Sequence, residues 1–303
     1  MSSSRQAAIK GPPGSVEYAL LAALSLTWGS SYMFTKIAVG PIPPFTLISV
    51  RLVISSLIMV TLSLLRGGMR LTWRDAAAFM TVGLLTNAAP LTLIAISVSH
   101  VHSSFTATTM ALVPLIATLI SASLGRRPGL RDVIGIVVGI CGIAVLFGPD
   151  AFLSSGESSR GALAAVGAAI VFSLSLFARD IVKHHSATNV AAGSLVGAAL
   201  WTIPVALALE GIPDHVPAPG VIAAALVLAV LNTAIASLLL FALLARATAT
   251  FTSYNNYLVP AVAVVCGSVF LGEPFTIQSF AGVALVLAGV GIATVRPKIR
   301  SHA

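Results

Sequence analysis

The most constraining feature of this chain is an internal repeat in a sequence that is apolar along almost its whole length. Phe105-Thr106 recurs as Phe251-Thr252, displaced by 146 positions. Leu112-Val113-Pro114 recurs as Leu258-Val259-Pro260 with the same displacement. Charged residues make up only 9% of the chain and hydrophobic residues 57%, whereas soluble domains carry roughly 25% charged residues. We therefore expect a membrane protein made of two related halves.

Apolar runs bounded by proline, glycine and charge clusters predict ten membrane-spanning helices. The runs lie near 18–38, 45–65, 76–97, 101–124, 130–147, 161–178, 187–209, 220–245, 250–271 and 276–295. With the N-terminus inside, 14 of the 17 Lys and Arg residues fall in cytoplasmic segments and one, Arg160, falls in an external loop. Cytoplasmic loops of membrane proteins carry such an excess of positive charge. The sequence predicts an all-α membrane protein of ten transmembrane helices with both termini cytoplasmic.

Ten spans and an offset of 146 divide the chain into two copies of five helices. Because five is odd, the second copy is predicted to be inverted in the bilayer, as in alternating-access transporters. The predicted parts are a cytoplasmic segment at 1–16, the first repeat at 17–147, an external loop at 148–160, the inverted second repeat at 161–296 and a cytoplasmic tail at 297–303.

Polar and aromatic positions that recur at the repeat offset predict a central cavity for a polar substrate. Polar side chains in lipid are costly, so they face a partner helix or a cavity. The predicted substrate-binding residues are Trp28, Ser31, Tyr32, Asn87, Thr106, Thr109, Met110, Phe172, Ser175, Asn232, Thr252, Asn255 and Asn256. For any single hydroxyl, a hydrogen bond between helices is the competing explanation. The recurrence of Asn87 as Asn232, at a neighbouring offset of 145, favours the cavity.

Two matched prolines lie within the predicted spans. Pro114 and Pro260 each remove a backbone donor and bend a helix. They are predicted either as hinges for opening and closing or as static bends that fit curved helices together. A set of glycines is expected instead to allow close helix packing. These are Gly135, Gly139, Gly142, Gly282 and Gly289.

The distribution of charged residues indicates whether transport is coupled to protons. All nine carboxylates are predicted to lie at span ends or in loops, so no buried acid is expected. Proton-coupled carriers usually keep a titratable group at membrane depth. We therefore expect facilitated diffusion or exchange. Lys36 and Arg51 lie within spans, where they could attract an anionic group, extend to the outer headgroups, or bond the ends of neighbouring helices.

Several classes of function are excluded or disfavoured. The two cysteines show no metal-ligand spacing, so we expect no metal and no cofactor. A net charge of +8 reflects the asymmetry of the loops rather than nucleic-acid binding. An enzyme within the membrane would need a metal box or a nucleophile paired with a base at depth, and none is present in the sequence. The chain is not expected to be an enzyme.

Short motifs in order along the chain resemble the drug/metabolite transporter superfamily, in its EamA-type ten-helix branch. The motifs are Trp28-Gly29-Ser30-Ser31 with Lys36, Pro44 with Arg51, and Leu271-Gly272-Glu273 with Gln278, Gly282 and Gly289. Arg126-Arg127 departs from the pattern, because many members carry a glutamate there. The resemblance implies a multi-pass protein of the cell inner membrane that exports small metabolites. Within the branch, the chain looks most like the YddG-like aromatic amino acid exporters.

These observations predict a transporter that exports amino acids, aromatic or neutral, by alternating access of two inverted repeats. The alternative within the same fold is a multidrug exporter or an exporter of another metabolite such as a purine or polyamine. A passive channel remains a separate possibility from the sequence. The expected partners are a small-molecule substrate and membrane lipid, with no nucleic acid, and the protein is expected to be a monomer or a homodimer.

Overall fold

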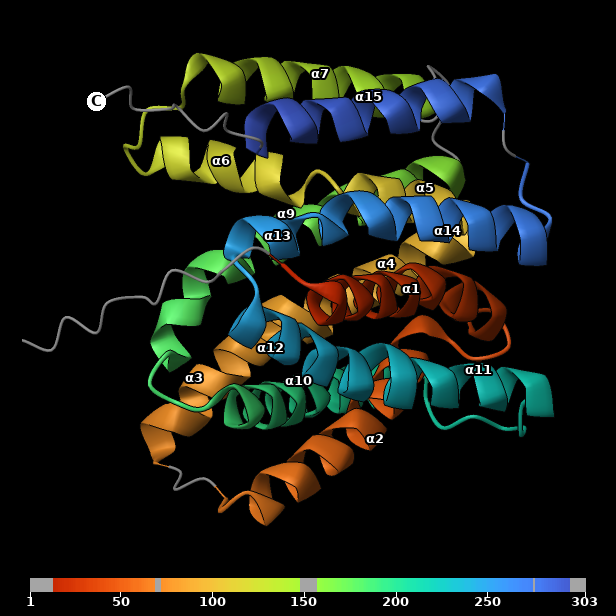
Figure 1. Cartoon of the computed structure of the whole chain (residues 1–303). Helices are drawn as coiled ribbons and strands as arrows, with labels where there is room; N and C mark the ends of the chain where they lie inside the picture. Colours follow the sequence, from red (N-terminus) through yellow and green to blue (C-terminus); the bar gives the residue numbers. More distant parts are fainter. Residues whose placement is uncertain (1–12, 69–71, 148–156, 275, 295–303) are drawn as a thin grey trace, which may run out of the picture.

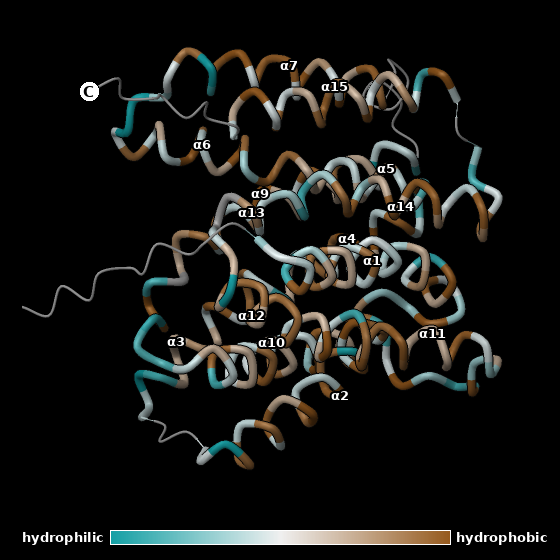
Figure 2. Tube along the Cα trace, in the orientation of Figure 1, coloured by the Kyte–Doolittle hydropathy of each residue, from teal (hydrophilic) through white to brown (hydrophobic). Residues whose placement is uncertain are grey.

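The structure is a computed structural model that describes residues 13–68, 72–147, 157–274 and 276–294. Within these ranges every regular element is a helix, apart from one isolated bridge between Val39 and Ile42. Figure 2 shows hydrophobic residues along most of the helices and hydrophilic segments gathered at the turns between them. The tail predicted at 297–303 lies outside the described residues, as do most of the predicted N-terminal segment and external loop.

The helices follow one another along the chain in the order drawn in Figure 1. The first half contains α1 (Ser15–Ala38), α2 (Pro44–Leu65), α3 (Trp73–Gly83), η1 (Leu84–Ala88), α4 (Ala89–His100), α5 (Ser103–Met110), α6 (Val113–Ser123) and α7 (Leu130–Phe147). The second half contains α9 (Glu157–Ala178), η2 (Arg179–Val182), α10 (Ala187–Leu209), α11 (Pro219–Ala229), η3 (Val230–Ile235), α12 (Ala236–Arg246), α13 (Ala249–Ser253), α14 (Asn255–Leu271) and α15 (Ile277–Thr294).

Among the described residues, eight helical stretches are long and apolar enough to cross a membrane. They cover residues 44–65, 73–100, 103–123, 157–182, 187–209, 219–246, 251–271 and 277–294. The other two predicted spans correspond to α1 and α7, which have 24 and 18 residues but are not among the eight. Each carries an acid in its first turn, Glu17 in α1 and Asp132 in α7. The structure thus supports eight of the ten predicted spans, and the other two stay predictions.

Four of the predicted spans are interrupted rather than continuous. Two contain π-helical turns, η1 and η3, whose first residues are positions 84 and 230. Two are broken, one between α5 and α6 and one at Tyr254 between α13 and α14. π-Helical turns are rare and frequently occur at functional sites. The π-helical turns therefore recur at the sequence offset of 146 seen in the repeat, and each half also contains one broken helix.

The main packing contacts join a helix of the first half to one of the second. α7 packs along α15, α1 along α14 and α2 along α10 (Figure 1). A Cβ added to Gly135 of α7 would lie only 2.5 Å from the carbonyl oxygen of Gly289 of α15. Glycine permits such backbone approach because it has no side chain. The prediction that these glycines serve close packing is confirmed for this pair.

Charged side chains bind backbone groups at three helix ends. Lys36 Nζ donates to the carbonyl oxygens of Val98 and Val101, at 2.5 and 2.9 Å, at the end of α4. Of the alternatives open for Lys36, the structure shows bonding to a neighbouring helix end. Carboxylates bind amide groups at two helix beginnings. Glu210 accepts hydrogen bonds from the backbone N–H groups at the start of α2, and Glu273 does so at the start of α5.

The expectation that the chain has no buried acid is wrong at Glu273. Its side chain is only 8% exposed. Oε1 accepts from the N–H of Ser103 at 2.6 Å, and Oε2 accepts from the N–H and hydroxyl of Ser104 at 3.2 and 3.0 Å. A carboxylate at a helix beginning is stabilised by the unpaired N–H groups and by the helix dipole. The turn that holds Glu273 is folded against α5, which the sequence did not indicate.

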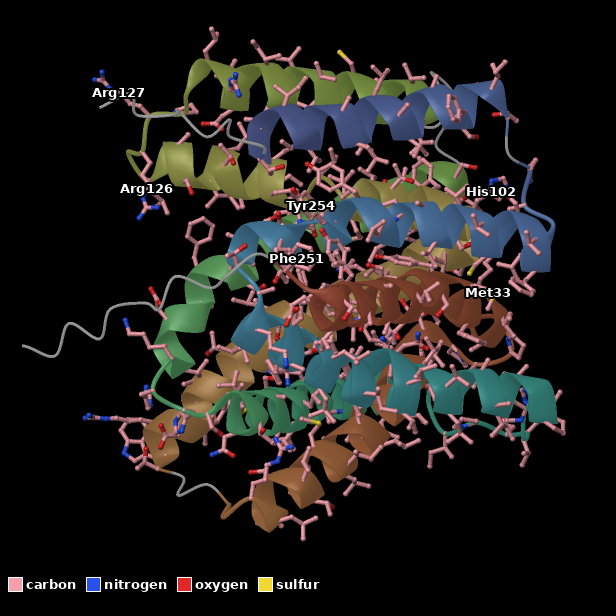
Figure 3. All side chains as sticks on the ribbon, in the orientation of Figure 1. Met33, His102, Arg126, Arg127, Phe251 and Tyr254 are labelled. Carbon is pink, nitrogen blue, oxygen red and sulfur yellow. The ribbon has the colours of Figure 1, made fainter. Side chains whose placement is uncertain are left out.

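One end of the bundle carries two exposed arginines. Figure 3 shows Arg126 and Arg127 beyond the end of α6, at the end of the bundle opposite His102. Arg126 and Arg127 are exposed. α1 begins and α15 ends at this same end of the bundle (Figure 1).

Candidate functional site

A cavity of about 200 Å³ lies in the middle of the bundle between the two halves. Its lining residues are Trp28, Ser31, Tyr32, Thr35, Arg51, Thr86, Asn87, Pro90, Leu91, Ile94, Ala107, Met110, Ala111, Val113, Phe172, Asn232, Thr233, Ser237, Asn255, Asn256, Val259 and Pro260. Both π-helical turns and both broken helices contribute to this wall. The interruptions thus place irregular backbone beside a cavity, where it is tolerated within a membrane.

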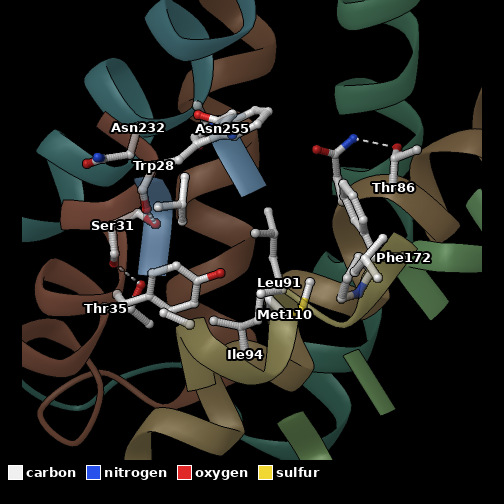
Figure 4. A pocket seen from close by; sticks show the side chains of 18 of the residues that line it. Trp28, Ser31, Thr35, Thr86, Leu91, Ile94, Met110, Phe172, Asn232 and Asn255 are labelled. Carbon is white, nitrogen blue, oxygen red and sulfur yellow. Dashed lines mark hydrogen bonds between the residues drawn. The ribbon is translucent and has the colours of Figure 1, made fainter. Parts of the chain in front are cut away.

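Nine of the thirteen predicted substrate-binding residues line this cavity. They are Trp28, Ser31, Tyr32, Asn87, Met110, Phe172, Asn232, Asn255 and Asn256. In Figure 4, Trp28 and Ser31 lie on one side of the cavity and Thr86 and Phe172 on the other. The cavity therefore presents hydroxyl, amide and aromatic groups from both halves of the chain.

The other four predicted residues do not line the cavity. The hydroxyl of Thr106 lies 2.7 Å from that of Ser97, on α4. Thr109 and Thr252 each donate to the carbonyl oxygen four residues earlier, and Ser175 donates to the one three residues earlier. Hydroxyl groups in helices commonly donate their hydrogen bond to a carbonyl oxygen of the preceding turn. On α5 the residues that line the cavity are Ala107 and Met110 instead, and Ala111 directly after the helix lines it as well.

The two π-helical turns hold the matched asparagines in different roles. Asn87 of η1 is half-buried and donates from Nδ2 to the hydroxyl of Thr86 at 2.8 Å (Figure 4). Asn232 of η3 is 1% exposed, and its Nδ2 donates to the carbonyl oxygen of Thr27 and to the hydroxyl of Ser30. Asn87 is thus free to meet a ligand, whereas the amide nitrogen of Asn232 ties η3 to α1.

Sequence reasoning missed several lining residues that a stricter use of the repeat would have found. At the offset of 146, Thr86 matches Asn232 and Asn87 matches Thr233. All four residues line the cavity. Matching the two asparagines at an offset of 145 concealed the two threonines. Among the apolar lining residues, Val113 and Val259 also match at this offset, but apolar residues are common on every face of these helices, so the match did not mark them as lining a cavity.

Arg51 lies inside the bundle rather than at a headgroup surface. Arg51 is only 5% exposed, and it lines the cavity from α2. Nε donates to the hydroxyl of Thr233 at 2.7 Å, and Nη2 lies 3.5 Å from the carbonyl oxygen of Asn232. Of the alternatives open for Arg51, the structure excludes extension to the outer headgroups.

The matched prolines occupy different helix positions. Pro114 lies in the first turn of α6, directly after the break that follows α5. Pro260 lies inside α14 and lines the cavity, while the break in that half lies upstream at Tyr254. A proline in the first turn costs no helical hydrogen bond, whereas one in the interior does. The hinge role of both residues stays a prediction.

Comparison with known families identifies the chain's relatives. The profile of the EamA-like transporter family matches residues 16–148 and, a second time, residues 159–295. The chain belongs to the EamA-like transporter family. It is a multi-pass membrane protein of the drug/metabolite transporter superfamily, as the sequence motifs predicted.

Individual relatives of this EamA-like chain are also transporters by name. An uncharacterized transporter of Archaeoglobus fulgidus is 23% identical over 279 residues, which cover 90% of this chain and 97% of that protein. The threonine/homoserine exporter RhtA of Salmonella typhimurium is 32% identical over 180 residues, covering 59% of this chain and 58% of the exporter. A crystal structure of a protein at 21% identity covers 93% of this chain and 97% of its own, with a TM-score of 0.66. The names agree with the prediction that the chain is not an enzyme, and the crystal structure shows the fold alone.

The EamA-like chain also contains a polar cluster away from the cavity that sequence reasoning did not find. Nε2 of His185 and of His184 lie 2.9 and 3.4 Å from Oδ1 of Asp75. The other carboxylate oxygen of Asp75 accepts from the N–H and the hydroxyl of Thr72, which caps α3. The ligating atoms of the three residues lie within 4.8 Å of one another, close enough to share a metal ion. With the helix cap already using half of the carboxylate, the cluster serves as a contact between α3 and the turn before α10.

Proposed function

We propose that this transporter exports small metabolites, foremost amino acids with neutral or aromatic side chains, across the cell inner membrane. The observation that carries the proposal is the central cavity lined by both halves of the chain. Its hydroxyl and amide groups suit the polar part of an amino acid, and Trp28, Tyr32 and Phe172 suit an apolar side chain. The partial similarity to a threonine/homoserine exporter supports the same class of substrate.

The proposed architecture is ten spans in two inverted halves with both termini in the cytoplasm. The halves are the segments 17–147 and 161–296, joined by an external loop. Two matches to one family profile support the duplication. The presence of π-helical turns at equivalent places supports it further. The arginines beyond the end of α6 favour a cytoplasmic position for that end of the bundle.

The proposed mechanism is alternating access about the central cavity. Sites between inverted repeats commonly lie near the bilayer midplane and are exposed to each side in turn. The nine predicted residues that line the cavity would bind substrate, together with Thr86, Thr233 and Arg51. Pro114 and Pro260 are proposed hinges, because both lie in the helices that are broken beside the cavity.

A multidrug exporter of the same fold is the second candidate, and the cavity gives two reasons to rank it lower. A volume of about 200 Å³ is below the range of about 300–1,000 Å³ typical of pockets for drug-sized ligands. Lipophilic cations would also favour an acid in the wall, and none of the described lining residues is acidic. The second objection also applies to a polyamine exporter, because polyamines are cations. It does not apply to a purine exporter.

Counterflow in proteoliposomes tests the proposal. Vesicles are loaded with one unlabelled amino acid, and the entry of labelled phenylalanine, methionine or threonine is followed with and without a pH gradient. We expect saturable uptake that rises with internal amino acid and does not depend on the gradient. Asn87→Ala should reduce it, because Asn87 faces the cavity, and Ser194→Ala should not, because Ser194 bonds within α10. Unsaturable flux would indicate a channel, and absence of flux for every amino acid would refute this choice of substrate.

A further inference from the structure

One side chain in the cavity wall carries a formal charge. Among the described residues that line the cavity, the rest are apolar, aromatic, hydroxyl or amide side chains, and Arg51 is a guanidinium. Arginine stays protonated in proteins under ordinary conditions. The cavity between the two halves is therefore positively charged, in a region of low dielectric constant where a charge acts strongly.

The charge of Arg51 has no acidic partner among the described residues. Its hydrogen bonds are to the hydroxyl of Thr233 and, at a long 3.5 Å, to the backbone carbonyl oxygen of Asn232. The ion pairs found in the described part of the chain involve Asp75 and Asp180 instead. The three half-buried or buried glutamates of the described residues bind helix beginnings elsewhere: Glu17 at α1, Glu210 at α2 and Glu273 at α5. A buried cation without a counterion is unfavourable unless something else neutralises it.

A purely structural role for Arg51 is weakened by the repeat itself. Arg51 contacts the π-helical turn η3, so it could serve to stabilise that turn. The corresponding turn η1 forms in the other half of the chain as well. There, the position 146 residues after Arg51 is Gly197, which packs against the backbone of Phe79. A π-helical turn at this place in the fold therefore does not require a guanidinium beside it.

The donors of Arg51 that remain available match a carboxylate. A guanidinium has five N–H donors in a fixed planar fork, and the contacts described above use two of them. The remaining donors suit paired hydrogen bonds to the two oxygens of a carboxylate. Trp28 and Phe172 line the same cavity and can contact an apolar group on the same molecule.

We infer that Arg51 is the anion-binding group of the cavity, and that the transported molecules are organic carboxylates, amino acids among them. This inference rests on the proposed function and narrows it from small metabolites to compounds that carry a carboxylate. Amides and esters of the same shape are poor ligands, because they cannot neutralise the guanidinium. Organic cations are excluded, because they would bring a second positive charge into the cavity.

Pairs of ligands with the same shape test the inference on the purified protein. The probes are phenylalanine, threonine, methionine and 3-phenylpropionate, each beside its amide, at millimolar concentration and neutral pH. Binding is measured by thermal stabilisation in detergent, and counterflow is measured in vesicles. We expect the wild-type protein to favour the acid over the amide at least about tenfold in at least one pair, as a charge-assisted hydrogen bond provides. Arg51→Gln should bring that ratio to about threefold or less, and Arg51→Lys should keep part of it.

Matched variants separate binding from a structural role. Ser55→Ala removes a hydrogen bond between α2 and α11 one turn from Arg51, outside the cavity wall, and leaves the guanidinium, so it should keep the preference for acids. Equal loss of acid and amide binding in Arg51→Gln would overturn the inference, since that is the result of a structural role. If Arg51→Gln does not fold, the inference is judged from the ratio of acid to amide binding in the wild-type protein and in Arg51→Lys. The inference is also overturned if the wild-type protein binds none of the carboxylates, or if it binds the amides as tightly as the carboxylates.

The outcomes also distinguish the inference from the proposed function. Preferential binding of carboxylates without counterflow of any amino acid would refute the export of amino acids and support Arg51 as an anion site. Counterflow of amino acid amides as fast as that of the amino acids would overturn the anion site and leave amino acid export standing.

Discussion

Removing the carboxylate of Glu273 should measurably destabilise the protein. Glu273 follows α14 and binds the beginning of α5, far from it in the sequence. Replacing it with alanine would leave the N–H groups of Ser103 and Ser104 and one hydroxyl without this partner. Glu273→Gln keeps one acceptor oxygen but turns an NH₂ group toward a donor. The two substitutions therefore differ in how much of the contact they remove.

The expected loss follows from the geometry of the contact. Hydrogen bonds to a charged group contribute about 1.5–3 kcal/mol each, and two backbone donors at the helix beginning lose such a bond. Ser104 is half-buried, so water can replace part of the loss there. We expect Glu273→Ala to lower the free energy of unfolding by about 2–4 kcal/mol, and Glu273→Gln by about 1–2 kcal/mol.

Equilibrium unfolding in mixed detergent micelles, followed by tryptophan fluorescence, measures these free energies. Glu157→Ala is the matched control, because Glu157 also lies in the first turn of a helix but is exposed. Glu157→Ala should lower the free energy of unfolding by no more than about 1 kcal/mol. If Glu273→Ala is no more destabilising than Glu157→Ala, the carboxylate does not hold the beginning of α5 as described.

Three further predictions use the same assay. Gly135→Ala should lower the free energy of unfolding by about 1–3 kcal/mol, because its Cβ would lie 2.5 Å from a carbonyl oxygen of α15. Gly220→Ala is the control and should leave the free energy of unfolding unchanged, because nothing lies within 4 Å of its Cβ. Lys36→Met should cost about 1–3 kcal/mol through the loss of two bonds to the end of α4, and an equal effect of the exposed Lys183→Met would contradict this. Glu210→Ala should cost about 1–3 kcal/mol, less than Glu273→Ala, because Glu210 is less buried; a larger loss would reverse that order.

The course of the helices was largely predictable from the sequence, because length and hydrophobicity determine where a chain can cross a bilayer. Eight of the ten predicted runs coincide with helices that meet both criteria. The interruptions were not predictable. A π-helical turn such as η1 contains no proline or other residue that marks it in the sequence, and it depends on packing against neighbouring helices. Pro114 marked a bend in its helix, yet the break in the other half lies at Tyr254, away from the matching proline.

The cavity was predictable for amide and aromatic residues, as at Asn87, Asn232 and Phe172, all of which line it. It was not predictable for hydroxyl groups, even where they recurred: Thr106 recurs as Thr252, and neither lines the cavity. Thr106 and Thr109 lie on α5 beside cavity-lining residues, but a rotation of the helix by part of a turn directs them elsewhere. The burial of Glu273 depends on how a turn folds onto another helix, which neither hydropathy nor repeat spacing expresses.

The pairing of α7 with α15 has a consequence for how the protein is made. α15 is the last helix of the described residues, and it lies against the glycine face of α7 at the end of the first half. During synthesis, α7 therefore enters the membrane before its main partner exists. Its glycine face must remain in lipid or against a transient partner until α15 has been synthesised. Assembly of this helix pair therefore comes late in biogenesis, and a chain truncated before α15 would leave α7 open to insertion chaperones and membrane proteases.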